Sequence, residues 1–116
     1  MRATEFRLIR EGLGLTGGWL SSHLEVNPRT IDRWEAGDTA IPEFAARALR
    51  DLEQRARDEV AARVDALEHW GVQEVSIHET PGSMPARWQR AVAFRVRQEV
   101  GDVLIVTGPA EISDPR

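Results

Sequence analysis

The sequence contains no cysteine, which excludes a disulfide framework and a thiolate metal site. It has no apolar run near the roughly 18 residues that a membrane-spanning helix requires. Its first twelve residues, MRATEFRLIREG, carry too many charges for a signal peptide. We therefore expect a cytoplasmic protein without membrane contact.

Motifs of catalysis and of cofactor binding are also missing. The chain has no Gly-x-Ser-x-Gly elbow, no P-loop and no dinucleotide fingerprint. Its three histidines, His23, His69 and His78, do not form a His-x-x-His or His-Glu-x-x-His pair. We expect no catalytic residue, no metal, no cofactor and no enzymatic activity.

The charges are distributed unevenly along the 116 residues, whose net charge is −4. Residues 1–57 hold nine arginines and nine acidic residues, whereas residues 58–116 hold six arginines and ten acidic residues. A protein of this charge is not an indiscriminate nucleic-acid binder, although a neutral first half permits specific binding. We expect two parts, a DNA-binding domain over residues 1–56 and a linking helix with a dimerisation element over residues 57–116.

Four helices are predicted in the first 70 residues. Thr16, and Asn27 followed by Pro28, are residues that favour the start of a helix. Gly37 favours the end of one. After Pro42, apolar residues recur at a spacing near four as far as residue 67, as in an amphipathic helix. The expected helices cover residues 4–11, 17–24, 27–36 and 42–70. The first half of the last is expected to pack on the helix-turn-helix, and its second half is alternatively a separate helix or a dimer contact.

The period of the apolar residues changes to two after Gly71. Residues 75 and 77 alternate in VQEVSIHET, and residues 92, 94 and 96 alternate in AVAFRV, which predicts strands on either side of a loop over residues 80–85. Gly101-Asp102 is either a hairpin turn leading to a third strand through VLIV or part of a short helix. We expect an α+β fold with a helical N-terminal bundle, a long linking helix and a short antiparallel sheet.

Residues 15–37 have the layout of a helix-turn-helix, in which the first helix crosses the DNA backbone and the second enters the major groove. Ile31 and Trp34 lie three residues apart, and we predict that both face the first helix of this motif, residues 17–24. Arg29, Thr30 and Arg33 are then left on the outer side. Arginine is the commonest bidentate partner of guanine, so this outer side is the expected DNA-contacting surface.

The same segment, LTGGWLSSHLEVNPRTIDRWEAG, resembles the lambda-repressor-like (XRE) helix-turn-helix family, and the resemblance extends over about residues 5–52. It implies that Arg10 and Glu35 form an ion pair between the first and third helices. It also implies contacts to phosphate at the start of the second helix and to base edges at the start of the third. The implied DNA-binding residues are Thr16, Gly17, Gly18, Asn27, Pro28, Arg29, Thr30 and Arg33.

Two positions depart from that family. Gly17 stands where the family often has a phosphate-binding glutamine, and Glu25 stands where the tight turn usually has glycine. The stretch WEAGDTAIPE with the following helix also resembles the small anti-CRISPR-associated (Aca) repressors, whose tail is a dimerisation element. That resemblance implies a strand near residues 91–97 followed by a helix, which conflicts with a hairpin at Gly101.

These observations predict a transcriptional regulator, specifically a repressor that binds an inverted repeat of double-stranded DNA as a homodimer. An antitoxin that autoregulates its operon and neutralises a toxin through its C-terminal part is the alternative. A protein-interaction module that lost DNA binding is a second alternative. Formation of a stable complex with a toxin favours the antitoxin, and DNA binding that weakens steeply with salt excludes the protein-interaction module.

Overall fold

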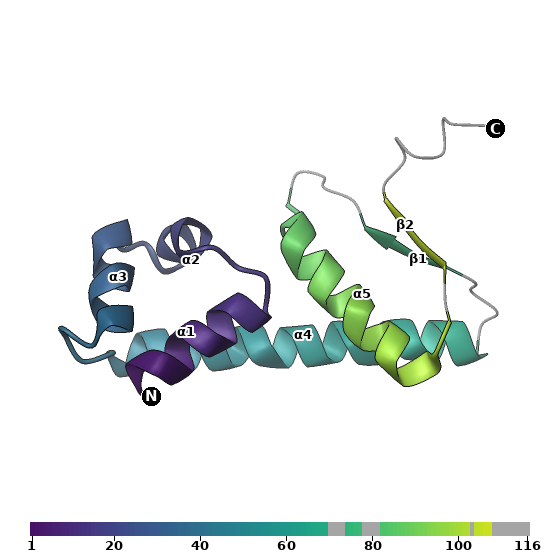
Figure 1. The fold of residues 1–116 in the computed structure, drawn as a ribbon, viewed down its shortest axis with the longest axis horizontal. Coiled ribbons are helices and arrows are strands. Elements are labelled where there is room, and N and C mark those ends of the chain that lie inside the picture. Colours follow the sequence, from purple (N-terminus) through teal and green to yellow (C-terminus); the bar gives the residue numbers. More distant parts are fainter. Residues whose placement is uncertain (70–73, 78–81, 103, 108–116) are drawn as a thin grey trace. The chain divides into compact units, whose positions relative to one another are not determined.

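A computed structural model of the chain describes residues 1–69, 74–77, 82–102 and 104–107 (Figure 1). The chain divides into two compact units, Met1–Arg55 and Ala56–Arg116. The elements follow in the order α1 (Ala3–Gly12), α2 (Gly17–Leu24), α3 (Pro28–Ala36), α4 (Glu43–His69), β1 (Glu74–Ile77), α5 (Ala86–Val100) and β2 (Leu104–Thr107). The long helix α4 contributes its first half to the first unit and its second half to the second.

The first unit is a small helical bundle in which α3 packs against both α1 and α2. Its core consists of apolar side chains that are almost completely removed from water, and the ring of Phe6 meets that of Trp34 edge to face at 5.9 Å. Burial of such side chains contributes roughly 1.5–3 kcal/mol each. The largest fully buried side chains of this unit are Phe6, Leu20, Ile31 and Leu49.

Local sequence signals explain the ends of these helices. Thr16 and Asn27 are the N-caps of α2 and α3, and Pro28 occupies the first position of α3. Gly37 closes α3 with φ 81°, a left-handed conformation that favours glycine. The four helices predicted in the first 70 residues are therefore confirmed, with ends that differ by at most one residue.

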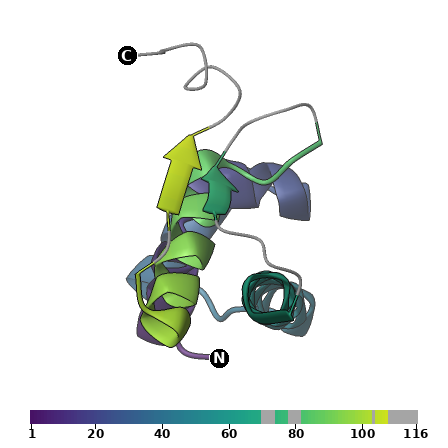
Figure 2. The same cartoon turned by 90° about the vertical axis from the view of Figure 1, so that its right-hand side faces the viewer.

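The second unit combines the end of α4 with β1, α5 and β2. The two strands pair in parallel, with Glu74 opposite Leu104 and Ile77 opposite Thr107, and Figure 2 shows their arrows pointing the same way. Helix α5 is the crossover that joins them, as parallel strands require. Trp88 of α5 is fully buried, and its Nε1 donates a hydrogen bond of 2.8 Å to Oε1 of Glu59 on α4.

The predicted α+β fold with an antiparallel sheet is wrong. Five helices dominate the described residues, and the only two strands among them are short and parallel. The hairpin at Gly101-Asp102 is also wrong, because Gly101 is the C-cap of α5. Of the alternatives left open for residues 99–107, the structure has a strand at Leu104–Thr107, preceded by the end of α5.

The strand expected at residues 91–97, from alternation and from the Aca resemblance, is instead the middle of α5. Val92 and Val96 are buried with Trp88, four residues apart, whereas Phe94 is 62% exposed. The buried apolar residues therefore follow the spacing of a helix. The exposed Phe94 between Val92 and Val96 produced the alternation that resembled a strand.

None of the helices in the described ranges is both long enough and apolar enough to cross a membrane.

Candidate nucleic-acid interface

Helix α3 has one buried face and one exposed face. Ile31 and Trp34 keep only 1% and 5% of their surface exposed, and they hold the inner face against α1 and α2. Arg29 and Arg33, four residues apart, are both exposed. Neither guanidinium makes a hydrogen bond or an ion pair with any residue in the described part of the chain. Two cations are therefore available to an external ligand on one face of α3.

The start of α3 is held by its capping residue. The Oδ1 atom of Asn27 accepts a hydrogen bond of 2.9 Å from the backbone N–H of Arg29, so this oxygen satisfies one of the free donors of the helix end. Pro28 follows at the first helical position and is exposed. Thr30, predicted on the outer side, is half-buried at the edge of that face, unlike Arg29 and Arg33.

The start of α2 supplies the other predicted residues. Thr16 caps this helix, and its hydroxyl oxygen accepts a hydrogen bond of 3.0 Å from the backbone N–H of Trp19. Gly18 is exposed, whereas Gly17 is half-buried and a Cβ added there would lie 3.8 Å from Cγ2 of Ile31. Exposed backbone N–H groups at a helix N-terminus attract anions, so this end of α2 is suited to phosphate.

An ion pair joins α1 to α3. Arg10 binds Glu35 through both oxygens, with Nε–Oε2 at 2.6 Å and Nη2–Oε1 at 2.8 Å, and its Nη1 donates to the carbonyl oxygen of Leu15 at 2.9 Å. The two side chains are only 13% and 10% exposed. The hydrogen bonds to Glu35 raise the pKa of Arg10, against the opposing effect of burial, and the charges of Glu35, Glu11 and Asp32 add to the increase. This pair fixes the position of α3 relative to α1.

The turn between α2 and α3 contains the departure noted in the sequence. Glu25 adopts φ 57° and ψ 45°, and it is the one non-glycine residue with positive φ among those described. For an L-residue this left-handed conformation costs roughly 1–2 kcal/mol. The turn thus keeps the geometry that glycine would favour, with some strain.

Sequence reasoning missed one residue on the exposed face of α3. Asp32 is exposed and lies three residues after Arg29, so these two side chains are neighbours on the surface of α3. A carboxylate in this position can accept a hydrogen bond from the amino group of cytosine. The spacing of three from Arg29 is the signal that could have identified it.

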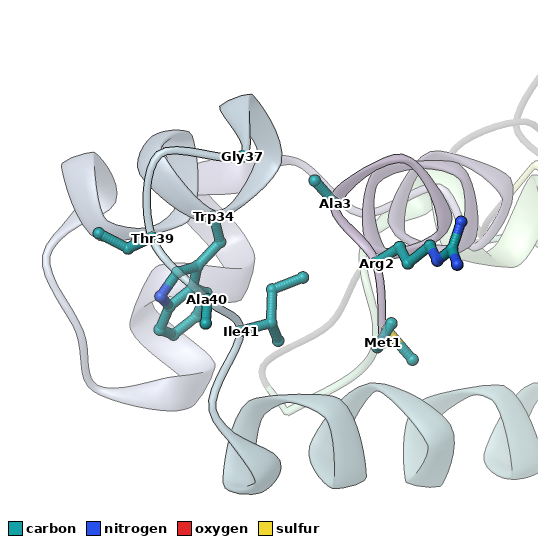
Figure 3. A pocket seen from close by; sticks show the side chains of 8 residues that line it. All are labelled: Met1, Arg2, Ala3, Trp34, Gly37, Thr39, Ala40 and Ile41. Carbon is teal, nitrogen blue, oxygen red and sulfur yellow. The ribbon is translucent and has the colours of Figure 1, made fainter.

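A separate cavity of about 420 Å³ lies between the start of α1 and the segment that follows α3 (Figure 3). Its walls include Met1, Trp34 and Ile41. In Figure 3 the side chain of Arg2 extends away from Trp34, which leaves a mainly apolar lining. The cavity therefore lacks the converging polar groups that orient a specific ligand.

Within the described ranges, no three His, Asp or Glu side chains gather in a way that could hold a metal ion. Comparison of the chain with models of known protein families and with curated proteins finds no match.

Proposed function

We propose that the chain is a sequence-specific DNA-binding transcriptional repressor that binds an inverted-repeat operator as a homodimer through α3. The observation that carries this proposal is the pair of exposed guanidiniums of Arg29 and Arg33, which have no partner in the described part of the chain. They project from a helix whose opposite face is locked in the core by Ile31 and Trp34. A rigid helix with exposed arginines is suited to direct contact with base edges in the major groove.

The start of α2 has the complementary role in this proposal. Thr16, Gly17 and Gly18 face the phosphate backbone through backbone N–H groups and the exposed hydroxyl, which sets the depth at which α3 enters the groove. At the start of α3, Asn27, Pro28 and Thr30 lie beside the bases, with Thr30 at the margin because it is half-buried. The Arg10–Glu35 pair keeps the two helices in a constant arrangement.

Charge and geometry support specificity rather than tight general binding. Residues 1–57 are electrically balanced, so attraction to phosphate alone is weak and contacts to bases have to supply much of the preference. One helix touches few base pairs. A two-fold dimer doubles the contacts, and its half-sites lie about 10–11 base pairs apart.

Selection of bound sequences from a random DNA library tests the proposal. The wild-type chain should enrich a palindrome, and Arg29→Ala should lose preference at one position in each half-site, by about 1–3 kcal/mol. Arg7→Ala is the matched control, because Arg7 is exposed on α1 and pairs with Glu11. It should leave base preference unchanged.

Two results would contradict the proposal. One is the absence of any enriched sequence, and the other is an Arg29→Ala variant that weakens binding equally on all sequences. A salt titration provides a second measurement, since binding that depends on phosphate contacts must weaken as salt rises.

A further inference from the structure

The face of α5 that points away from the core carries an unusual group of side chains. Arg87, Arg90, Phe94 and Arg97, here called the α5 outer face, are exposed and recur at spacings of three and four. Phe94 lies in the middle of this face and is 62% exposed, whereas Val92 and Val96 on the opposite side are buried. The aromatic ring is thus flanked by guanidiniums on neighbouring turns.

The charges of this face are largely unsatisfied. Arg97 pairs with the exposed Asp102 at 2.9 Å, but neither Arg87 nor Arg90 forms an ion pair or side-chain hydrogen bond with any described residue. This is unexpected in a region where acidic residues outnumber arginines. Arginine and aromatic side chains are enriched in the energetically important parts of protein interfaces. The face therefore has the composition of a binding surface for an acidic segment with an apolar residue.

The chain itself contains such a segment in Glu111, Ile112 and Asp114, which lie outside the described residues. If extended, the stretch from Glu111 to Asp114 spans about 10 Å. The helical rise from Arg90 to Arg97 is also about 10 Å. We propose that the segment 111–114 of one copy binds the α5 outer face of a second copy, with its two carboxylates toward the arginines and Ile112 against Phe94.

The reach of the segment favours a second copy over the same molecule. Strand β2 ends at Thr107, and the four residue steps to Glu111 cover at most about 14 Å. The buried side of α5 packs against β1, the partner of β2, so the outer face lies around the far side of the helix. Half the circumference of a helix with side chains is about 16–19 Å. Exchange of the segment between two copies is reciprocal and closes a two-fold dimer.

This inference rests on the proposed function in one respect, the homodimer, and it identifies the surface that the dimer uses. Because the chain has no cysteine, Ser113→Cys gives a single attachment site for a nitroxide spin label. Spin-labelled chain at natural isotope abundance is mixed with ¹⁵N-labelled chain that carries no spin label. We expect the amide signals of Arg90 and Phe94 in the ¹⁵N-labelled copy to lose intensity.

The matched control is Ser113→Cys combined with Glu111→Gln and Asp114→Asn, which keeps the label and removes both carboxylates. The loss of signal should disappear, and self-association measured by sedimentation should weaken about fivefold for each ion pair removed. Arg90→Glu tests the other side of the contact and should have the same effect, with circular dichroism used to verify that α5 remains folded.

Three results would overturn the inference. The α5 signals stay unchanged in the mixed sample, or they are lost only when label and ¹⁵N are on the same molecule, or they are lost equally in the control variant. None of these measurements includes DNA. A chain that passes them and enriches no DNA sequence would refute the proposed repressor and leave this contact established.

Discussion

Replacing Arg10 by methionine should destabilise the first unit severely. The change retains a long apolar side chain but removes both hydrogen bonds to Glu35 and the bond to the carbonyl oxygen of Leu15. Glu35 is left as a carboxylate with 10% of its side chain exposed and no cation beside it. Breaking a buried pair from one side costs about 3–5 kcal/mol. The free energy of unfolding of a unit of 55 residues is only about 3–8 kcal/mol, so Arg10→Met should remove most of it.

A double-mutant cycle with Arg10→Met, Glu35→Met and the combined variant isolates the pair. The combined variant should be more stable than Arg10→Met alone, because it leaves no unpaired charge. We expect a coupling free energy of about 2–3 kcal/mol, measured by urea denaturation with tryptophan fluorescence. The pKa of Arg10 is raised in the folded state, so its contribution is complete at neutral pH and disappears only at strongly alkaline pH.

A coupling free energy near zero would refute this reasoning. It would mean that Glu35 is well solvated without Arg10, and that the angle between α1 and α3 does not depend on the pair.

Three further substitutions test individual features of the fold by thermal or urea denaturation. Glu25→Gly should raise the free energy of unfolding by about 0.5–1 kcal/mol, because glycine adopts φ 57° without strain; a loss of stability would show that the glutamate side chain outweighs that strain. Gly18→Ala should also stabilise, by about 0.5–1 kcal/mol, since an added Cβ meets only Oγ1 of Thr16 at 3.9 Å, and an unfavourable effect would reveal a clash. Trp88→Phe should cost about 1.5–3 kcal/mol through loss of the hydrogen bond to Glu59, and a smaller loss would mean that this bond adds little to the other contacts of the two residues.

The helices of the first unit were predictable because their signals are local. The caps at Thr16 and Asn27 and the glycine at 37 act through the backbone of the nearest residues, so no tertiary contact is needed to recognise them. The exposed position of Arg29 and Arg33 follows from the same local helix, once Ile31 and Trp34 are assigned to the core. The half-buried state of Thr30 was not predictable in this way, because it depends on how α3 packs.

The second unit was harder for a physical reason. Residues 91–97 satisfy a period of two through Val92, Phe94 and Val96, and a period near four through Trp88, Val92 and Val96. The two patterns share two residues, and only the environment of Phe94 distinguishes them. Since Phe94 is exposed and Trp88 is buried, the helical period is the correct one.

By itself the sequence determined the positions of the first three helices to within one residue and which side of α3 carries the arginines, because caps and helical spacing act over a few residues. Only the tertiary structure decided that residues 86–100 are a helix, that β1 and β2 run parallel, and that Arg10 binds Glu35 through two oxygens. These features depend on contacts between residues at least 25 positions apart in the chain. Such contacts form only when whole elements pack together, so the pattern within any single segment does not contain them.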